Sequence, residues 1–504
     1  MRTLEVRLCA PPLHPHRELT FSGTGKCHER ATTIDMLVDD ILLETFDFCR
    51  KMHYIWDPFP PHHIWDWHIL VHVCRRWRKI IFDSPCRLNL RILCTYGTRV
   101  RKNLGIWPAF PINLQLYSRA KLRPKDEDNA IAALEHRNRV NSVRLFGTGS
   151  QITKVAAAMQ EPFPVLTYLN LCSCCEDTSV IPAGFLGGSA PHLQEITLCR
   201  IPFPSLPTLL LSTSDLNTLN LLDIPTLGYI SPKRMVACLA ALPRLEVFNI
   251  RFPDLGSRPR RIRQPPATRS VLPALTTFSF QGAFEYLEDF VAQIDTPQLE
   301  EISLHYLDQP DDFQVTQVSH FIDRTIGPGS SRHANVQFQF DQVTFALSRD
   351  YEIDQGWARR CISTTISYEA FDWPELSDVA RVLSRFSAAL CTVVYLELKA
   401  ELDNDLSDRA YDVDWLDLLR QCPAIQTLHV YRELAAPVSL SLQVITTEMF
   451  TGVFPSLGLI YLEGEPASSL EKTVAILRFS DHPITVVETP DEFTKRLESF
   501  VSSR

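Results

Sequence analysis

The chain has 504 residues, more than one ordinary core needs, so it forms either several domains or one long array. Its 45% hydrophobic and 22% charged residues are typical of a folded, water-soluble protein. A formal net charge of −9 argues against a general nucleic-acid binder, which needs a positive face to displace counterions.

Other features narrow the cellular setting. No stretch reaches the roughly 18 apolar residues that span a bilayer, so we expect no membrane insertion, and residues 1–20 lack the apolar core of a secretory signal. The 14 cysteines have no regular spacing, so we expect reduced thiols in the cytoplasm or nucleus. The cluster Cys172-Ser-Cys174-Cys175 lacks a second ligand pair, so we expect thiols in a loop after a strand and no metal site.

The first 30 residues are rich in Pro, His, Arg, Gly and Thr without periodicity, and we expect them to be disordered. From Ile34 the pattern is helical, with Asp39 and Asp40 in the first turn, where the helix dipole favours anions. Its apolar positions follow steps of three and four: Val38, Ile41, Leu42, Phe46 and Cys49.

A second helix follows a stretch rich in proline and aromatic residues. Its apolar face consists of Leu70, Val73, Cys74, Trp77, Ile80 and Ile81. The helical module over residues 31–90 is too small to bury much surface alone. Its apolar positions exceed what two helices need to cover each other, so we expect it to dock on the rest of the chain or on another protein.

Two segments of this module resemble the F-box motif. Residues 34–46 resemble its opening, Leu-Pro-x-Glu/Asp-x-Leu-x-x-Ile, and residues 70–78 (LVHVCRRWR) resemble its more specific half, Leu-x-x-Val-Cys-x-x-Trp. The chain departs from the motif at Val38, which replaces a proline, and at Thr45, which replaces an isoleucine. Residues 52–66 look like an insertion between the helices.

The resemblance implies binding to the Skp adaptor, and through it to cullin, in a Skp–cullin–F-box ubiquitin ligase. Helix-in-groove docking uses apolar anchors, and truncating a buried Trp anchor often costs about 2 kcal/mol or more. The adaptor-binding residues carried over from the motif are Leu37, Val38, Leu42, Leu43, Leu70, Val73, Cys74 and Trp77. For each of them, the alternative is that it only fills the core between the helices.

After an expected linker over residues 91–130, an apolar hexad, h-x-x-h-x-h, recurs along the chain. Some copies carry a proline two residues before the first apolar position: Pro164, Pro191, Pro243, Pro273, Pro297, Pro423 and Pro455. The copies without that proline begin at Val140, Leu216, Phe340 and Val393. This recurrence predicts a stacked repeat array over residues 131–504, in preference to an ordinary α/β domain.

Each unit is predicted to be a helix, a proline that stops the helix, and a short strand. Apolar faces place the helices at 231–242, 283–294, 377–390 and 413–420. The hexads resemble degenerate leucine-rich repeats of the helix-bearing kind. That resemblance implies an α/β horseshoe, or solenoid, with parallel strands and a C-terminal cap made of a helix over 468–479, a strand over 484–487 and a helix over 490–501.

The order of F-box-like module and degenerate repeats is similar to that of many fungal F-box proteins. It implies a substrate receptor that is not an enzyme, holds no cofactor, and binds an unknown target protein through its repeats. Two alternatives stay open: a repeat scaffold without a ligase, its F-box eroded at Val38, and an enzyme on an α/β fold. We expect target contacts near exposed positions beside the strand apolars, for example Asn170, Thr197, Asn220, Asn249, Ser279 and Ser303.

Overall fold

The structure is a computed structural model, and it divides into two compact units, Met1–Asn89 and Leu90–Arg504. The residues it describes are 34–56, 67–117, 124–174, 180–253, 268–306, 316–326, 332–339, 342–348, 361–367, 390–400, 415–443, 454–463 and 485–489. The segment expected to be disordered, 1–30, lies outside the described residues. So do the helices expected over 468–479 and 490–501, and of the helix expected over 377–390 only residue 390 is described.

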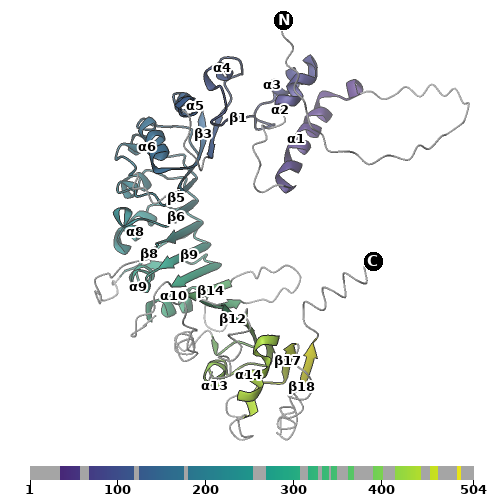
Figure 1. The fold of residues 1–504 in the computed structure, drawn as a ribbon, viewed down its shortest axis with the longest axis vertical. Helices are drawn as coiled ribbons and strands as arrows, with labels where there is room; N and C mark the ends of the chain where they lie inside the picture. Colours follow the sequence, from purple (N-terminus) through teal and green to yellow (C-terminus); the bar gives the residue numbers. More distant parts are fainter. Residues whose placement is uncertain are drawn as a thin grey trace, which may run out of the picture. The chain divides into compact units, whose positions relative to one another are not determined.

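The described part of the first unit is helical (Figure 1). Its elements are η1 (Ile34–Met36), α1 (Asp39–Trp56), α2 (Trp67–Val73) and α3 (Arg75–Asp83). The prediction of one helix through 70–81 is wrong, because Cys74 has extended backbone (φ −153°, ψ 171°) and caps α3. Its Sγ accepts the Trp77 N–H at 3.4 Å, which satisfies a donor in the first turn.

The second unit confirms the predicted mixed α/β class with a large, mostly parallel sheet. Its first half contains β1 (Ile92–Cys94), α4 (Val100–Leu104), β2 (Ile112–Tyr117), α5 (Pro124–Leu134), β3 (Val140–Gly147), α6 (Gly149–Ala158), β4 (Tyr168–Ser173), η2 (Phe185–Gly188), β5 (Glu195–Cys199), α7 (Leu206–Leu210), β6 (Thr218–Leu222), η3 (Thr226–Gly228), α8 (Pro232–Leu239), β7 (Val247–Arg251), β8 (Ser270–Val271), β9 (Thr277–Gly282), α9 (Phe284–Val291), β10 (Ile294–Asp295) and β11 (Glu301–Tyr306). The expected helices over 231–242 and 283–294 appear as α8 and α9.

The second half continues the same sheet. It contains α10 (Thr316–Ile326), β12 (His333–Gln339), β13 (Gln342–Ser348), β14 (Cys361–Ser367), β15 (Tyr395–Ala400), α13 (Trp415–Leu419), β16 (Thr427–Val430), α14 (Arg432–Gln443), β17 (Leu459–Glu463) and β18 (Thr485–Thr489). The described strands form a 16-stranded sheet that begins at β1 and ends at β18, so it does not close into a barrel, while β8 and β10 pair separately.

The prediction that residues 91–130 form a linker is wrong. This segment holds β1, α4, β2 and the start of α5, and β1 pairs in parallel with β2 at the first edge of the sheet. The alternation in β2 buries Ile112, Leu114 and Leu116 and leaves the residues between them half-buried. A period of two is the signature of a strand, but this segment lacks the full hexad and its proline.

The apolar hexad at Phe340 predicts one more parallel strand, and this prediction is also wrong. Its Val343 and Phe345 lie in β13, which runs antiparallel to both β12 and β14. Only residues 340 and 341 separate β12 from β13, which is too short for the crossover that a parallel pair needs. Because β14 pairs with β11 and β12 pairs with β15, both in parallel, the sheet continues past this reversal.

A β-turn precedes several of the hexads. The Leu166 N–H donates to the Phe163 carbonyl at 3.2 Å, which places Pro164 at the second position of the turn. The corresponding bond is made by the N–H groups of Leu193, Leu245, Leu299, Ile425 and Leu457. The aligned proline is therefore a turn residue, since its fixed φ suits this position, and it does more than stop a helix.

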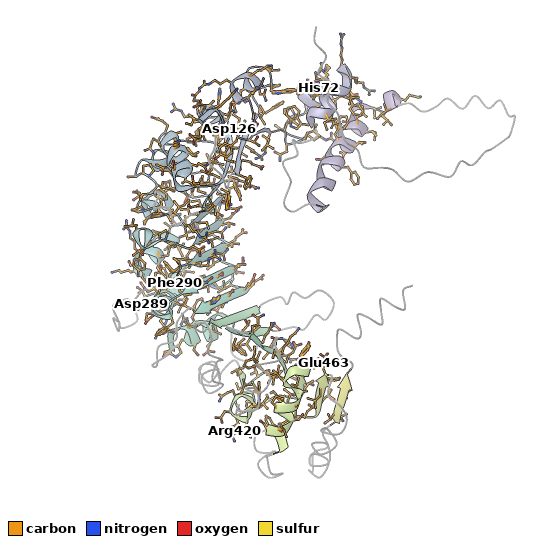
Figure 2. All side chains as sticks on the ribbon, viewed as in Figure 1. His72, Asp126, Asp289, Phe290, Arg420 and Glu463 are labelled. Atoms are coloured by element: carbon orange, nitrogen blue, oxygen red, sulfur yellow. The ribbon has the colours of Figure 1, made fainter. Side chains whose placement is uncertain are left out.

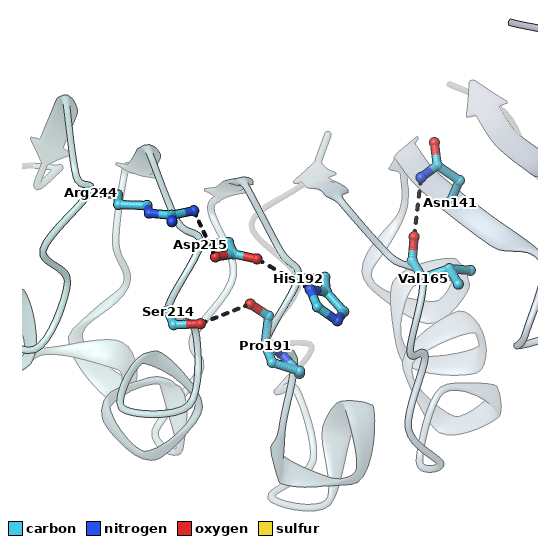
Figure 3. A network of polar contacts seen from close by, with 7 residues as sticks. All are labelled: Asn141, Val165, Pro191, His192, Ser214, Asp215 and Arg244. Atoms are coloured by element: carbon cyan, nitrogen blue, oxygen red, sulfur yellow. Dashed lines mark hydrogen bonds and ion pairs between the residues drawn. The ribbon is translucent and has the colours of Figure 1, made fainter. Parts of the chain in front are cut away.

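Side chains connect successive turns (Figure 3). The Asp215 carboxylate lies 3.2 Å from His192 Nδ1 through one oxygen and 3.0 Å from Arg244 Nη1 through the other. The Ser214 hydroxyl donates to the Pro191 carbonyl at 3.4 Å. His192, Asp215 and Arg244 each stand directly before the first apolar residue of a hexad, so the network joins equivalent positions of three consecutive units.

Strand residues alternate between two environments. On one face, side chains such as Leu169 and Leu171 of β4 are buried, and helices line that side of the sheet (Figure 1). The core includes an aromatic cluster in which Phe278 packs 5.8 Å from Phe248 and 5.5 Å from Phe290, measured between ring centroids; Phe290 is labelled in Figure 2. The opposite, mostly half-buried face is called the partly exposed face below.

Candidate interaction surfaces

The first unit is held together at the start of α1 by Arg76 of α3. Its guanidinium donates to Asp39 Oδ1, at 2.7 Å from Nη2 and 3.0 Å from Nε, and to the carbonyl of Leu37. Trp77, the next residue, packs on Phe46 of α1 with ring centroids 4.8 Å apart. The Val-Cys-Arg-Arg-Trp segment is thus placed against α1 by a polar contact and an aromatic contact.

The sequence-predicted adaptor residues fall into three classes. Leu42 and Leu43 are buried and belong to the core of the unit. Four residues are half-buried and contribute partly to internal packing: Leu37, Leu70, Cys74 and Trp77. Val38 and Val73 remain 62% and 56% exposed, which makes them the members of the set available to a partner.

The first unit exposes further apolar side chains that the sequence analysis left out of the site. Together with the two valines, the large exposed apolar side chains among its described residues are Ile34, Met36, Val38, Ile41, Phe48, Ile69 and Val73. Val38, directly before α1, and Ile41 and Phe48 of α1 follow steps of three and seven, which is one helical stripe. This stripe differs from the buried stripe of Leu42 and Phe46, so α1 is apolar on two sides.

The partly exposed face of the second unit carries a continuous row of in-register residues. From β4 to β11 the partners in adjacent strands are Asn170, Thr197, Asn220, Asn249, Ser279 and Ser303. These are the positions that the sequence analysis named for target contacts, and the structure brings all of them together as neighbours across the sheet. We call them the central polar row.

Members of the central polar row are less exposed than expected. Asn220 Nδ2 donates to Thr197 Oγ1 at 3.0 Å, and Asn249 Nδ2 donates to Asn220 Oδ1 at 2.6 Å. Thr197 is buried and the two asparagines are half-buried. In-register side chains on neighbouring parallel strands lie about 5 Å apart, so amides and hydroxyls can bond along the row and shield one another.

The row continues into the C-terminal strands with a different chemistry. Past β14 and β13 it runs through Asn335, Glu397, His429 and Tyr461. Glu397 accepts from Asn335 Nδ2 at 2.8 Å and from the hydroxyl of Tyr431, whose ring stacks on His429 with centroids 4.7 Å apart. The row thus changes from neutral amides and hydroxyls to aromatic rings and a carboxylate.

Two histidine–glutamate pairs flank this part of the sheet. His333 Nε2 lies 3.8 Å from Glu397, and His429 Nε2 lies 3.7 Å from Glu463, which is labelled in Figure 2. Burial lowers the pKa of His333, and the nearby Glu397 carboxylate opposes that change. Within the described residues there is no group of three or more His, Cys, Asp or Glu side chains arranged to hold a metal ion.

Two further sequence features have partial outcomes. Cys172 lies within β4 and not in a loop after it, whereas Cys175 lies outside the described residues. None of the helices in the described ranges has the length and apolar character needed to cross a membrane.

No protein-family model matches the chain, and no curated protein matches it either, so both surfaces are interpreted from their own chemistry.

Proposed function

We propose that the chain is a substrate-recognition subunit of a Skp–cullin–F-box ubiquitin ligase. In this proposal the first unit is the F-box module that binds the Skp adaptor, and the second unit binds the target protein. The chain itself catalyses no transfer step, since other subunits deliver ubiquitin, and it works in the cytoplasm or nucleus. The observation that carries the proposal is that the small, helical first unit exposes several large apolar side chains.

Exposed apolar side chains on a small helical unit are typical of a protein-docking surface. Val38 neighbours Leu37 and Asp39, both of which contact Arg76, and Val73 stands three residues before Arg76. The Arg76 contacts therefore bring the start of α1 close to the junction of α2 and α3, where both exposed valines lie. Full burial of a Val side chain is worth about 1.5–3 kcal/mol, so covering these residues would favour a complex.

The proposal also assigns the second unit to a leucine-rich-repeat-like solenoid. Its support is the recurrence of one backbone pattern: the Gln194 and Glu195 N–H groups both donate to the Thr167 carbonyl, at 2.8 and 3.1 Å. The pairs Asn217–Thr218, Glu246–Val247, Thr276–Thr277 and Glu300–Glu301 each donate in the same way to one carbonyl of the preceding unit. Stacked units that contact mainly their neighbours present an extended surface, here the partly exposed face with its central polar row.

The test is co-purification of the full chain with a Skp-family adaptor. Wild type should retain the adaptor, and the double variant Val38→Asp/Val73→Asp should bind it at least tenfold more weakly, because two charges enter an apolar interface. The matched control is Leu211→Asp/Leu227→Asp, which places the same charges at equally exposed apolar positions of the second unit. Circular dichroism verifies that each variant is folded.

The outcomes separate the proposal from its alternative. Retention by wild type and the control, with loss in the Val38/Val73 variant, supports adaptor binding through the first unit. Failure of wild type to retain any Skp-family adaptor contradicts the ligase assignment and favours a repeat scaffold that works without a ligase. Equal loss in both double variants contradicts the assignment of the docking face to the first unit.

A further inference from the structure

The partly exposed face of the second unit also carries two cysteines that are partners in adjacent strands. Cys172 of β4 and Cys199 of β5 are in register, one step beyond the buried pair Leu171 and Leu198. Both thiols are free and half-buried. Parallel neighbouring strands lie about 4.8 Å apart, which falls inside the range of about 4.4–6.8 Å between Cα atoms that a disulfide needs.

The interaction between the two thiols favours a thiolate at Cys199. A hydrogen bond from the Cys172 thiol lowers the pKa of Cys199 to about 7, with Arg200 and Arg251 acting in the same direction and burial and Asp223 opposing. Both arginines are held beside the pair by Asp223, at 3.3 Å from Arg200 Nε and 2.7 Å from Arg251 Nε. The hydrogen bond between the two thiols raises the pKa of Cys172, which keeps that sulfur protonated as the donor.

Among the described cysteines, no other pair combines adjacent strands with a lowered thiol pKa. Burial raises the pKa of Cys94 to about 12, and that of Cys422 to about 12 as well. Cys86 and Cys391 are exposed and lie outside the described strands. Cys391 interacts with Cys422, whose raised pKa keeps that thiol protonated. Reactivity toward oxidants follows thiolate character and access, and a neighbouring thiol is what resolves the first oxidation product.

We propose that Cys172 and Cys199 form a peroxide-sensitive dithiol that closes reversibly into a cross-strand disulfide. In the first step the Cys199 thiolate attacks a peroxide oxygen, the S–O bond forms, the O–O bond breaks, and the leaving oxygen takes a proton to become water or an alcohol. Cys172 then loses its proton and attacks the Cys199 sulfur, the S–S bond forms, and the S–O bond breaks to release water. The peroxide is the two-electron oxidant, and the two thiols are oxidised.

This site is independent of adaptor binding. It lies two residues along the strands from Asn170 and Thr197 of the central polar row, on the same face of the sheet. A disulfide there joins two consecutive units covalently, and it sits near the short end of the Cα range, so thiol reductants should open it readily.

The experiment treats the reduced full chain with hydrogen peroxide near neutral pH and maps cysteine linkages by non-reducing peptide mass spectrometry. We expect a Cys172–Cys199 disulfide that dithiothreitol reverses. In Cys172→Ser we expect a sulfenic acid at Cys199, trapped by a 1,3-dicarbonyl reagent, and in Cys199→Ser we expect Cys172 to stay reduced. Cys86→Ser is the control and should still form the disulfide.

A second measurement needs no substitution. At neutral pH the initial alkylation rate of Cys199 by iodoacetamide should exceed that of the exposed Cys86 by about threefold, since a larger thiolate fraction is partly offset by lower nucleophilicity. Oxidation of Cys86 while Cys172 and Cys199 stay reduced would overturn the proposal. Pairing of Cys199 with any cysteine other than Cys172 would overturn it as well.

Discussion

The two units of the chain differ in the surfaces that their described residues offer to a partner. The first unit leaves large apolar side chains uncovered on α1 and α2, while the second unit lines its partly exposed face with groups that already bond to one another, as in the central polar row. Apolar exposure on a small helical unit favours one permanent kind of partner. A row of half-satisfied amides and hydroxyls favours recognition by hydrogen bonds, and this difference supports the proposal of two binding tasks in one chain.

The largest expected effect compares buried and exposed phenylalanines across the units. Phe278→Ala removes a fully buried ring from the second unit and should lower its free energy of unfolding by about 3–5 kcal/mol. Phe48→Ala removes an exposed ring from the first unit and should change stability by less than about 0.5 kcal/mol. Urea unfolding of both variants checks this, and an equal loss would break the comparison.

A pH experiment separates the second unit from the first. Glu288 of α9 accepts the N–H groups of Gln317 and Val318 at 2.8 and 2.9 Å, at the start of α10. Burial, opposed by these bonds, raises the pKa of Glu288 from 4.5 to about 7. A raised carboxyl pKa means that the folded state binds the proton more tightly, so stability falls as pH rises from about 4.5 to about 7.

Glu288→Gln removes the ionisation and keeps one acceptor oxygen in place of the two that accept the Gln317 and Val318 N–H groups. The melting temperature of the second unit should then vary less between those pH values than in wild type. Glu285→Gln, at an exposed position of the same helix, is the control and should leave the pH profile unchanged. An unaltered profile in Glu288→Gln would contradict the role given to its burial.

A smaller effect is expected for the Arg76 contacts of the first unit. Arg76→Ala removes the bonds to Asp39 and to the Leu37 carbonyl, and should destabilise this unit by about 1 kcal/mol because the pair is partly screened by solvent. Hydrogen exchange at the first turn of α1 should accelerate while exchange in β4–β9 stays unchanged. Arg76→Lys, which restores a single donor, should recover part of the protection.

The smallest expected effect lies in the turns of the second unit. Asp215→Ala removes the contacts to His192 and Arg244, both largely exposed, and should cost less than about 1 kcal/mol. Thermal unfolding checks this value. A loss of several kcal/mol would mean that the turn network, and not the apolar hexads, holds consecutive units together.

Much of the second unit could be predicted because the hexads encode both strand period and spacing. The register of the central polar row follows from the repeat, since equivalent positions in stacked parallel strands become neighbours. The reversal at β13 was missed because Val343 and Phe345 alternate as they would in a parallel strand, and strand direction leaves no mark in a period of two. The β1–β2 edge was missed because its strands lack the full hexad.

The first unit was harder to predict in detail. Cys74 fits the apolar face of a continuous helix, and its role as an N-cap depends on backbone geometry that the pattern does not carry. Val38, Ile41 and Leu42 satisfy helical spacing together, yet the fold buries only Leu42. Which stripe of a doubly apolar helix faces the core is decided by its neighbours, here the packing of Phe46 on Trp77.

Hydrogen exchange of the full chain with and without a Skp-family adaptor tests the central claim most directly. The account predicts slower exchange in residues 37–48 and 69–77, and no change in the strands of the central polar row. Adaptor-induced protection in β4–β11 with none in α1–α3 would contradict the division of tasks between the two units.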